Sequence, residues 1–417
     1  MPVGAAMSRI SQWSTLINKF QSRLSKWKAS SLSFGGRLTL CKAVLGSLGT
    51  YLFSLYKAPV KIINTLESYR RRFFWGGSTD KNKMSWIAWD KVLASVVDGG
   101  LGVGSLKAQN LVLLGKWWWR FKSNKKELWK DVITAIYGKE GGFNAPSREK
   151  RKGFCWGTIV NLHSTLLKLG IDLKILFSNQ SEGRFWKLVA SGIYTVASLR
   201  VHIDNKILPK SSNCWIWNQL VPRKVNILAW RVSHGRLPTK ENLFKLGIGS
   251  NPLCTLCNQY AESESHLFTN CSVSLKVWSA VASWWHRFPP GFQSVTNLLH
   301  CKVNLQSNDD LGLLHEAVAL VFIWVIWSFR NKMTYSEKRI SPSCLINDIQ
   351  TLSYLWINVR HKSKKLRWFL SNFHLCFRGS RKSSFRTSQL HSLELEKSHE
   401  GGEVVAKHLA GSLIRIH

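Results

Sequence analysis

Three cysteines and one histidine lie close together in this chain and follow the spacing C-x2-C-x8-H-x4-C. Two thiolates separated by two residues can bind one metal ion, and a helical turn can bring the second pair together. Asn251 and Pro252, just before the first cysteine, favour the tight turn that such a pair requires. The candidate ligands are Cys254, Cys257, His266 and Cys271.

The donor set predicts both the metal and its role. Zinc suits three soft thiolates and one imidazole in a closed tetrahedral shell, which leaves no open position for water. The sequence therefore predicts one structural Zn2+, contributing on the order of 10 kcal/mol or more of apparent folding free energy at neutral pH. The alternative is that unrelated cysteines fall together by chance.

The charge balance indicates the kind of partner. The 417 residues include 59 Lys plus Arg against 23 Asp plus Glu, a net charge of +36, which favours a polyanion, most often nucleic acid. A membrane is not expected, because the longest clean apolar run, 317–327, is far shorter than the roughly 20 residues that a span needs. Nine widely spaced cysteines and no opening signal peptide predict an intracellular protein in a reducing compartment.

The apolar pattern at the start of the chain is helical. Apolar residues recur at three- and four-residue steps from Trp13 to Trp27, and Gly35-Gly36 then breaks the pattern. A second helical stretch is expected over 37–56 and a third after Pro59. Up to Trp75 the chain has twelve Lys or Arg and one acid, Glu67, so these helices face either phosphate or only solvent.

Further along, helices again dominate the predicted structure. The glycines of 98–104 lack the spacing of a dinucleotide fingerprint and predict a turn before a helix over 106–121. That helix contains Trp117, Trp118 and Trp119, for most of which we expect core packing. The remaining expectations are a linker or exposed loop at 122–152, strand character at 194–201, a helical block at 215–285 that holds the metal candidate, and a buried helix at 317–329.

No motif in the sequence predicts catalysis. The chain has no HExxH, GxSxG or Gly-x4-Gly-Lys-Ser pattern. The adjacent carboxylates Asp309 and Asp310 lie in a polar stretch, which is a poor platform for two-metal phosphoryl transfer. We therefore predict no catalytic residue.

Several short motifs precede the candidate ligands, namely Val221-Pro-Arg-Lys224, Ala229-Trp-Arg231 and Arg236-Leu-Pro-Thr239. With the Cys-Cys-His-Cys set, they resemble the zinc-binding domain of plant LINE-type (non-LTR) retrotransposon reverse transcriptases. Upstream, Leu24-Ser-Lys-Trp-Lys-Ala29 and Arg71-Arg-Phe-Phe-Trp-Gly-Gly77 look like the region just after the polymerase palm of that family. The resemblance covers roughly residues 1–377.

The helical patterns and the resemblance together predict a mainly α fold, with a helical thumb-like domain followed by a small zinc-stabilised helical domain. Beyond Arg378 the chain is rich in Ser, Lys and Glu and has little apolar periodicity, which predicts a disordered C-terminal tail. The family's polymerase aspartates lie upstream of a turn that Met1-Pro-Val-Gly4 resembles, so no catalytic aspartate is carried over. The expected divisions are 1–122 (thumb-like region), 123–200 (linker and mixed segment), 201–290 (zinc-binding domain), 291–377 (helical region) and 378–417 (disordered tail).

The leading hypothesis is a nucleic-acid-binding, zinc-binding fragment of such a reverse transcriptase, catalytically silent alone and expected in the nucleus. Its partner would be an RNA or DNA backbone, with no small-molecule substrate; the oligomeric state stays open. One alternative is RNA-directed DNA polymerase activity with a palm encoded upstream, and another is a zinc-stabilised protein-interaction module. The expected phosphate contacts are Arg70, Arg71, Arg72, Arg223, Lys224, Arg231, Arg236 and Lys240.

Overall fold

The computed structural model divides the chain into two compact units, which we call unit 1 (described residues up to 211) and unit 2 (described residues from 217). Within the described residues only two short strands occur, so the prediction of a mainly α fold is confirmed. The predicted tail, 378–417, lies outside the described residues. The structure describes residues 7–26, 29, 31–77, 83–123, 127–143, 154–180, 183–211, 217–285, 288–289, 291–300, 309–335 and 341–360.

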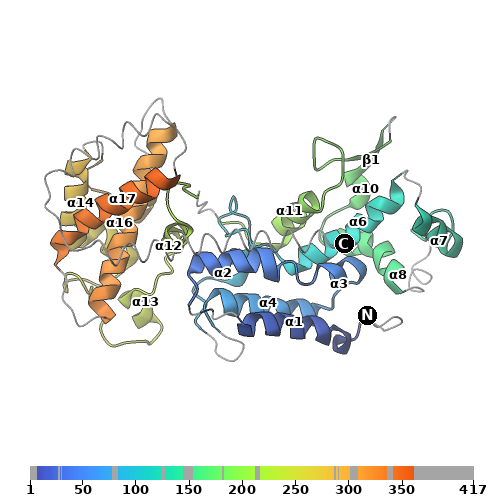
Figure 1. Cartoon of the computed structure of the whole chain (residues 1–417), viewed down its shortest axis with the longest axis horizontal. Helices are drawn as coiled ribbons and strands as arrows, with labels where there is room; N and C mark the ends of the chain where they lie inside the picture. The colour runs from blue at the N-terminus through green and yellow to red at the C-terminus, as the bar shows by residue number, and fades with distance from the viewer. Residues whose placement is uncertain are drawn as a thin grey trace. The chain divides into compact units, whose positions relative to one another are not determined.

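Unit 1 opens with helices that lie against one another (Figure 1). The predicted first helix is present, and it buries Trp13, Leu16 and Phe20 at three- and four-residue steps. The helix expected after Pro59 is also present, with Pro59 at its N-cap. The elements are η1 (Ile10–Trp13), α1 (Ser14–Lys26), α2 (Phe34–Leu40), the π-helical turn η2 (Cys41–Leu45), α3 (Thr50–Leu55) and α4 (Val60–Phe74).

The predicted break at Gly35-Gly36 is wrong, because both glycines lie inside α2. The hydroxyl of Ser33 caps this helix by accepting a hydrogen bond from the Gly36 N–H (3.1 Å), and Gly35 is buried. Capping and tertiary packing thus offset the low helix propensity of glycine. The expected helix over 37–56 is instead interrupted between η2 and α3.

The glycine-rich segment forms the predicted turn. Gly102 and Gly104 adopt positive φ angles of 63° and 70°, which favour glycine. The Ser105 hydroxyl then accepts the N–H of Ala108 (3.0 Å) and caps the helix that follows. The elements here are α5 (Trp89–Leu93) and α6 (Leu106–Lys122), so the predicted helix over 106–121 is confirmed.

The described part of residues 123–200 contains helices and a hairpin. Trp129 and Ile133 of the first of these helices pack on the core that α6 helps to form, so the expected linker or exposed loop at 122–152 contains a helix within 127–143. Residues 144–153 lie outside the described residues. The predicted strand at 194–201 is wrong: Thr195 caps a helix that buries Leu199. The elements are α7 (Leu128–Tyr137), α8 (Phe154–Val160), α9 (Leu162–Leu167), α10 (Leu173–Leu176), the antiparallel pair β1 (Phe177–Gln180) and β2 (Gly183–Trp186), and α11 (Val196–Ile207).

The three consecutive tryptophans of α6 all contact neighbouring elements. Trp117 donates its indole N–H to the carbonyl of Ser54 (2.8 Å), and Trp118 is buried against Phe177. Trp119 stacks on Tyr194 at a centroid distance of 6.1 Å. These rings therefore serve packing in unit 1, as expected for most of them.

Unit 2 is built around one long helix, α16, which packs against α17 and α12 (Figure 1). The predicted buried helix at 317–329 lies within α16 and is confirmed. The predicted helical block contains α12 to α14. The elements are α12 (Arg223–Ser233), α13 (Lys240–Lys245), the π-helical turn η4 (His266–Asn270), α14 (Ser272–Trp284), α15 (Val295–Leu299), α16 (Asp309–Tyr335), η5 (Pro342–Cys344) and α17 (Leu345–Arg360).

Helix α16 is longer than its uninterrupted apolar run suggests. The segment Gly312–Tyr335 is long and apolar enough to cross a membrane, with a mean hydropathy of 1.8. However, 78% of its apolar window is buried inside the protein, as in the core helix of a helical domain. Asp309 and Asp310 begin this helix, and their side chains lie outside the described residues.

Candidate metal centre and basic residues

The four candidate ligands converge on one point of unit 2. One donor atom from each of Cys254, Cys257, His266 and Cys271 lies within 4.8 Å of all the others. The sulfurs of Cys254 and Cys271 are 4.0 Å apart, and the Cys257 sulfur lies 3.2 Å from the Nε2 atom of His266. The structure therefore brings together all four residues that the spacing singled out.

These distances fit a tetrahedral zinc ion. With Zn–S near 2.3 Å and Zn–N near 2.0 Å, tetrahedral angles place two sulfurs about 3.8 Å apart and a sulfur and a nitrogen about 3.5 Å apart. The observed 4.0 and 3.2 Å lie close to these values. Three sulfurs and one imidazole also match the ligand preference of zinc over magnesium or calcium.

The first two ligands lie on a tight turn that directs backbone amides at sulfur. The N–H of Leu256 points at the Cys254 sulfur (3.4 Å), and the N–H of Asn258 donates to the Cys254 carbonyl (2.9 Å). Asn258 has a φ of 56°, a left-handed conformation that asparagine tolerates better than most residues. The turn thus partly neutralises a thiolate at Cys254.

The other two ligands are joined by the π-helical turn η4. In an α-helix, residues five apart point about 140° away from each other, because each residue turns the chain by about 100°. Here the Cys271 N–H donates to the His266 carbonyl (2.7 Å), a hydrogen bond over five residues that brings both side chains to the metal site. The spacing of the second pair therefore indicated a helical turn correctly. The turn is a π-helix, which is wider than an α-helix.

The last cysteine lies at the start of α14, where it is the N-cap residue. The hydrogen bond from the Cys254 thiol lowers the pKa of Cys271 to about 5; burial opposes this shift, and the N–H groups of Ser274 and Val273 add to it. The positive end of the helix dipole acts in the same direction. Conversely, that hydrogen bond and burial raise the pKa of Cys254.

The site is enclosed by protein. Cys254 and Cys271 are fully buried, His266 is buried, and Cys257 is half-buried. A closed shell of four protein ligands leaves no place for a substrate, which is the arrangement of structural zinc sites. The geometry suits a stabilising role for the metal.

Sequence reasoning missed two acidic residues beside the ligands. Glu264 accepts hydrogen bonds from the Leu237 N–H and the Asn242 side chain, both at 2.9 Å. Glu262, between Cys257 and His266, is completely buried and paired with Arg330 of α16. The available signal was two acids within 254–271, a segment that contains no Lys or Arg in an otherwise strongly basic chain.

Three of the eight basic residues expected to contact phosphate interact with other groups of the protein; two of them are buried, and Lys224 is half-buried. Arg70 is fully buried and donates two hydrogen bonds to Glu67, both at 3.0 Å. Arg231 is buried and donates to the Arg236 carbonyl (3.2 Å). The Lys224 ammonium lies over the rings of Trp324 and Trp356, at 5.2 and 5.5 Å from their centroids.

The other five are at least partly open to solvent. Arg71, Arg223 and Arg236 are exposed, and Arg72 and Lys240 are half-buried. Arg71 and Arg72 belong to α4 in unit 1, and the other three belong to unit 2. A basic residue can be buried when its charge is paired. The number of basic residues in a sequence therefore does not show which of them are buried.

Comparison with known proteins supports the metal assignment. Residues 194–278 match the family described as "zinc-binding in reverse transcriptase", which confirms the resemblance inferred from the motifs in this region. "Putative ribonuclease H protein At1g65750" of Arabidopsis thaliana is 24% identical over 376 residues, covering 72% of this chain and 60% of the relative. "Uncharacterized mitochondrial protein AtMg00310" of the same plant is 28% identical over 116 residues, covering 28% of this chain and 75% of the relative. The chain thus spans about 60% of the length of the first relative.

Proposed function

We propose that this chain is the nucleic-acid-binding, zinc-containing part of a LINE-type (non-LTR) retrotransposon reverse transcriptase. In this proposal one structural zinc is bound by Cys254, Cys257, His266 and Cys271, and the chain holds an RNA or DNA backbone without performing chemistry alone. The main support for the proposal is the distribution of charge over the first four helices. Several of their cations are exposed, and their one acid is paired with groups inside the protein.

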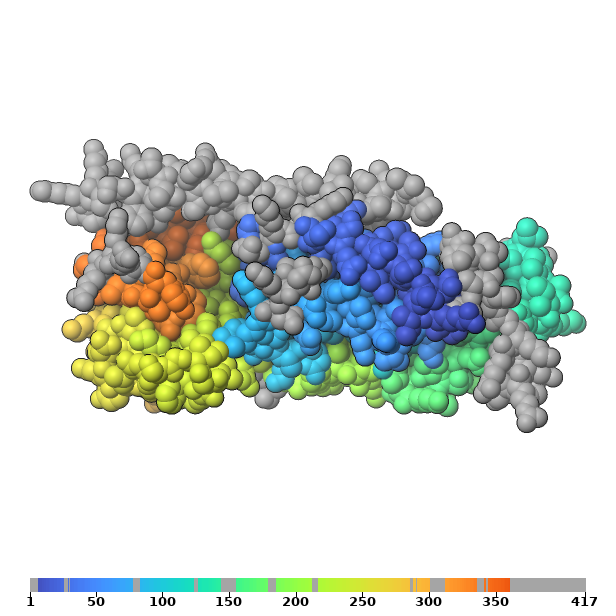
Figure 2. Space-filling model, turned by 90° about the horizontal axis from the view of Figure 1, so that it is seen from below, coloured from blue at the N-terminus to red at the C-terminus, as the bar shows by residue number. Residues whose placement is uncertain are grey.

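The only acid among the first 75 residues is neutralised inside the protein. Glu67 accepts hydrogen bonds from Arg70, from the Trp89 indole (2.8 Å) and from the Leu106 N–H (2.7 Å). The surface of these helices, coloured blue in Figure 2, therefore carries exposed cations, while the acid of this stretch is paired with Arg70. The exposed cations on which the proposal rests are Arg9, Lys19, Arg23, Lys57, Lys61 and Arg71.

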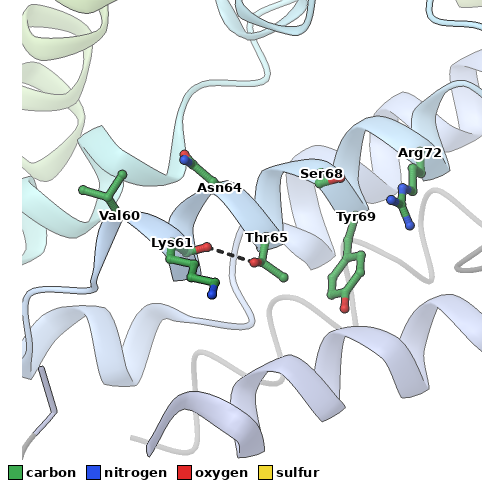
Figure 3. A pocket seen from close by; sticks show the side chains of 7 residues that line it. All are labelled: Val60, Lys61, Asn64, Thr65, Ser68, Tyr69 and Arg72. Atoms are coloured by element: carbon green, nitrogen blue, oxygen red, sulfur yellow. Dashed lines mark hydrogen bonds between the residues drawn. The ribbon is translucent and has the colours of Figure 1, made fainter. Parts of the chain in front are cut away.

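An open groove runs along one side of α4 within this basic surface. Figure 3 shows its lining side chains, which include the cations Lys61 and Arg72 and no acid. Tyr69 of this lining faces α1, where its hydroxyl accepts a hydrogen bond from Gln21 (3.0 Å). Lysine, arginine and hydroxyl side chains are the usual partners of phosphate oxygens in nucleic-acid complexes.

In unit 2 the metal site supports the backbone that carries two cations. Glu264, between the ligands, fixes the Leu237 N–H next to the exposed Arg236. Glu262 fixes the N–H of Lys240 at 3.0 Å. A zinc ion that orders this segment would therefore also order basic side chains available to a polyanion.

Binding should be sequence-tolerant and steeply dependent on salt, because phosphate contacts release counterions. Fluorescence anisotropy of the full chain with labelled RNA and DNA, single- and double-stranded, tests this. With six or more phosphate contacts, affinity should fall by about a thousandfold between about 50 and 200 mM salt. Affinity that does not change with salt, or no binding to any of the four polymers, would contradict the proposal.

One observation favours a second candidate, a zinc-stabilised protein-interaction module. Large apolar side chains are exposed around α13 and the first pair of ligands, and Tyr260 among them is 64% exposed. Exposed apolar residues of this kind often mark protein-binding surfaces. Salt-insensitive binding of a protein partner, without affinity for nucleic acid, would favour this candidate. These residues are Phe244, Leu246, Ile248, Leu253 and Tyr260.

A further inference from the structure

A buried carboxylate links the metal-binding turn to a helix far away in the sequence. The Glu262 side chain is fully buried, and Arg330, 68 residues later in α16, is only 1% exposed. One oxygen of Glu262, Oε1, accepts hydrogen bonds from Nε and Nη2 of Arg330 at 2.9 and 2.5 Å. Burial of two charges requires such pairing, because each ion loses its hydration.

The same carboxylate also holds the backbone at the metal site. Its Oε2 atom accepts the N–H of Thr255 (3.0 Å), and Thr255 lies between the ligands Cys254 and Cys257. Hydrogen bonds to the charged form outweigh the opposing effect of burial, and they lower the pKa of Glu262. The carboxylate is therefore a direct bridge from the metal-binding turn to α16.

A second contact joins the same two elements. The hydroxyl oxygens of Thr255 and Thr334 lie 3.4 Å apart, and the Thr334 hydroxyl donates to the Arg330 carbonyl (2.9 Å). Thr334 is one turn beyond Arg330, at the C-terminal end of α16. The metal-binding turn thus touches the last turns of α16 through both an ion pair and a hydroxyl pair.

We propose that Glu262 and Arg330 are positioning residues of the zinc site, and that metal binding and the order of the end of α16 depend on each other. This inference rests on the proposed zinc site. It extends the zinc-dependent unit to Arg330, well beyond the residues 194–278 that match the zinc-binding family. Linkage requires reciprocity: if α16 stabilises the metal-binding turn, the bound metal stabilises α16 to the same extent.

The first test measures zinc affinity of the full chain by competition with a coloured chelator. Arg330→Met should weaken zinc binding by about 10- to 100-fold, the usual effect of removing a group that orients a metal site. Arg330→Lys, which keeps the charge, should recover part of that loss. The matched control is Arg223→Met, which removes an exposed arginine of the same unit and should leave zinc affinity unchanged. Wild-type affinity in a folded Arg330→Met protein would overturn the inference.

A second test uses the wild-type chain and does not depend on the folding of a variant. Hydrogen exchange is followed by mass spectrometry before and after zinc is removed with a chelator. Removal should accelerate exchange in the last turns of α16, around residues 326–335, and leave α4 of unit 1 unchanged. Unchanged protection of 326–335 would overturn the inference.

Cobalt(II) substitution separates the failure of this inference from failure of the zinc site. Thiolate-to-cobalt absorption bands in the wild-type chain report a tetrahedral site with cysteine ligands. If the wild type and Arg330→Met show bands of equal strength and bind cobalt with equal affinity, the metal site exists and the positioning role is rejected. A wild-type chain that takes up neither cobalt nor zinc would overturn both proposals.

Discussion

Arg70 donates two hydrogen bonds to Glu67 one turn earlier on α4, both at 3.0 Å, and its side chain is completely buried. The same guanidinium reaches the carbonyls of Gly104 (3.2 Å) and Val103 (3.4 Å). The first of three consecutive arginines therefore binds protein rather than phosphate. Its two neighbours, Arg71 and Arg72, remain at least partly open to solvent.

This pair predicts a stability effect at Glu67. Glu67→Gln should lower the free energy of unfolding by about 3–5 kcal/mol, because it leaves the buried Arg70 charge without its partner. Urea unfolding of the full chain measures the loss. The control, Glu140→Gln, removes a largely exposed carboxylate paired with Lys122 and should change stability by less than about 1 kcal/mol. Equal effects of the two substitutions would contradict the structural role of Glu67.

The exposed cations of α4 predict the salt dependence of nucleic-acid binding. Lys61→Gln and Arg71→Gln should each weaken binding and reduce the slope of log affinity against log salt by about 0.7–0.9, the value of one phosphate contact. Lys139→Gln, an exposed lysine outside these helices, is the charge-matched control. A slope that changes equally in all three variants would show that only total charge matters.

Asp204 predicts a pH effect in unit 1. Burial raises the pKa of this carboxyl, against hydrogen bonds from Ser105 and the charge of Arg200. Between the usual carboxyl pKa of about 3.9 and the raised value, the folded state binds more protons than the unfolded chain. The free energy of unfolding should therefore fall as pH rises through this window.

Asp204→Asn should remove that dependence, so the wild type should lose stability relative to the variant as pH rises above about 4. Hydrogen exchange of α6 and α11 peptides across this pH range measures the difference within unit 1. Asp131→Asn, at an exposed position of α7, is the control. A wild type that gains stability relative to Asp204→Asn with rising pH would contradict the assignment.

Asn258 has a left-handed backbone conformation in the metal-binding turn, so we expect substitutions there to change the stability of the turn through backbone strain. Asn258→Val should destabilise the turn by about 1–2 kcal/mol, because a branched side chain is strained at a φ of 56°. Asn258→Gly should be tolerated, since glycine adopts this conformation readily. Chelator competition should show weaker zinc binding for the valine variant alone. Equal zinc affinities in both variants would contradict the conformation assigned to this turn.

Local patterns in the sequence were sufficient for the elements that depend on local physics. Apolar periodicity predicted α1, α4 and α6, and cysteine spacing predicted the four ligands that the structure brings together. Both signals work because the residues concerned lie within a few helical turns of one another or bind one common ion.

Features that depend on tertiary contacts were not predicted. The helix through Gly35 and Gly36 and the packing of α7 through Trp129 follow from burial against distant segments, which overrides local propensity. The pairing of Glu262 with Arg330 joins residues 68 positions apart, and neither residue type signals burial on its own.

The proposed zinc site is tested most directly by the zinc content of the purified full chain, wild type against Cys257→Ser. We expect one zinc per wild-type chain and a marked loss of zinc in the variant, because a serine hydroxyl is a poor replacement for a thiolate ligand. A folded wild-type chain that contains no zinc, or a Cys257→Ser chain that binds zinc as tightly as the wild type, would contradict the proposed site.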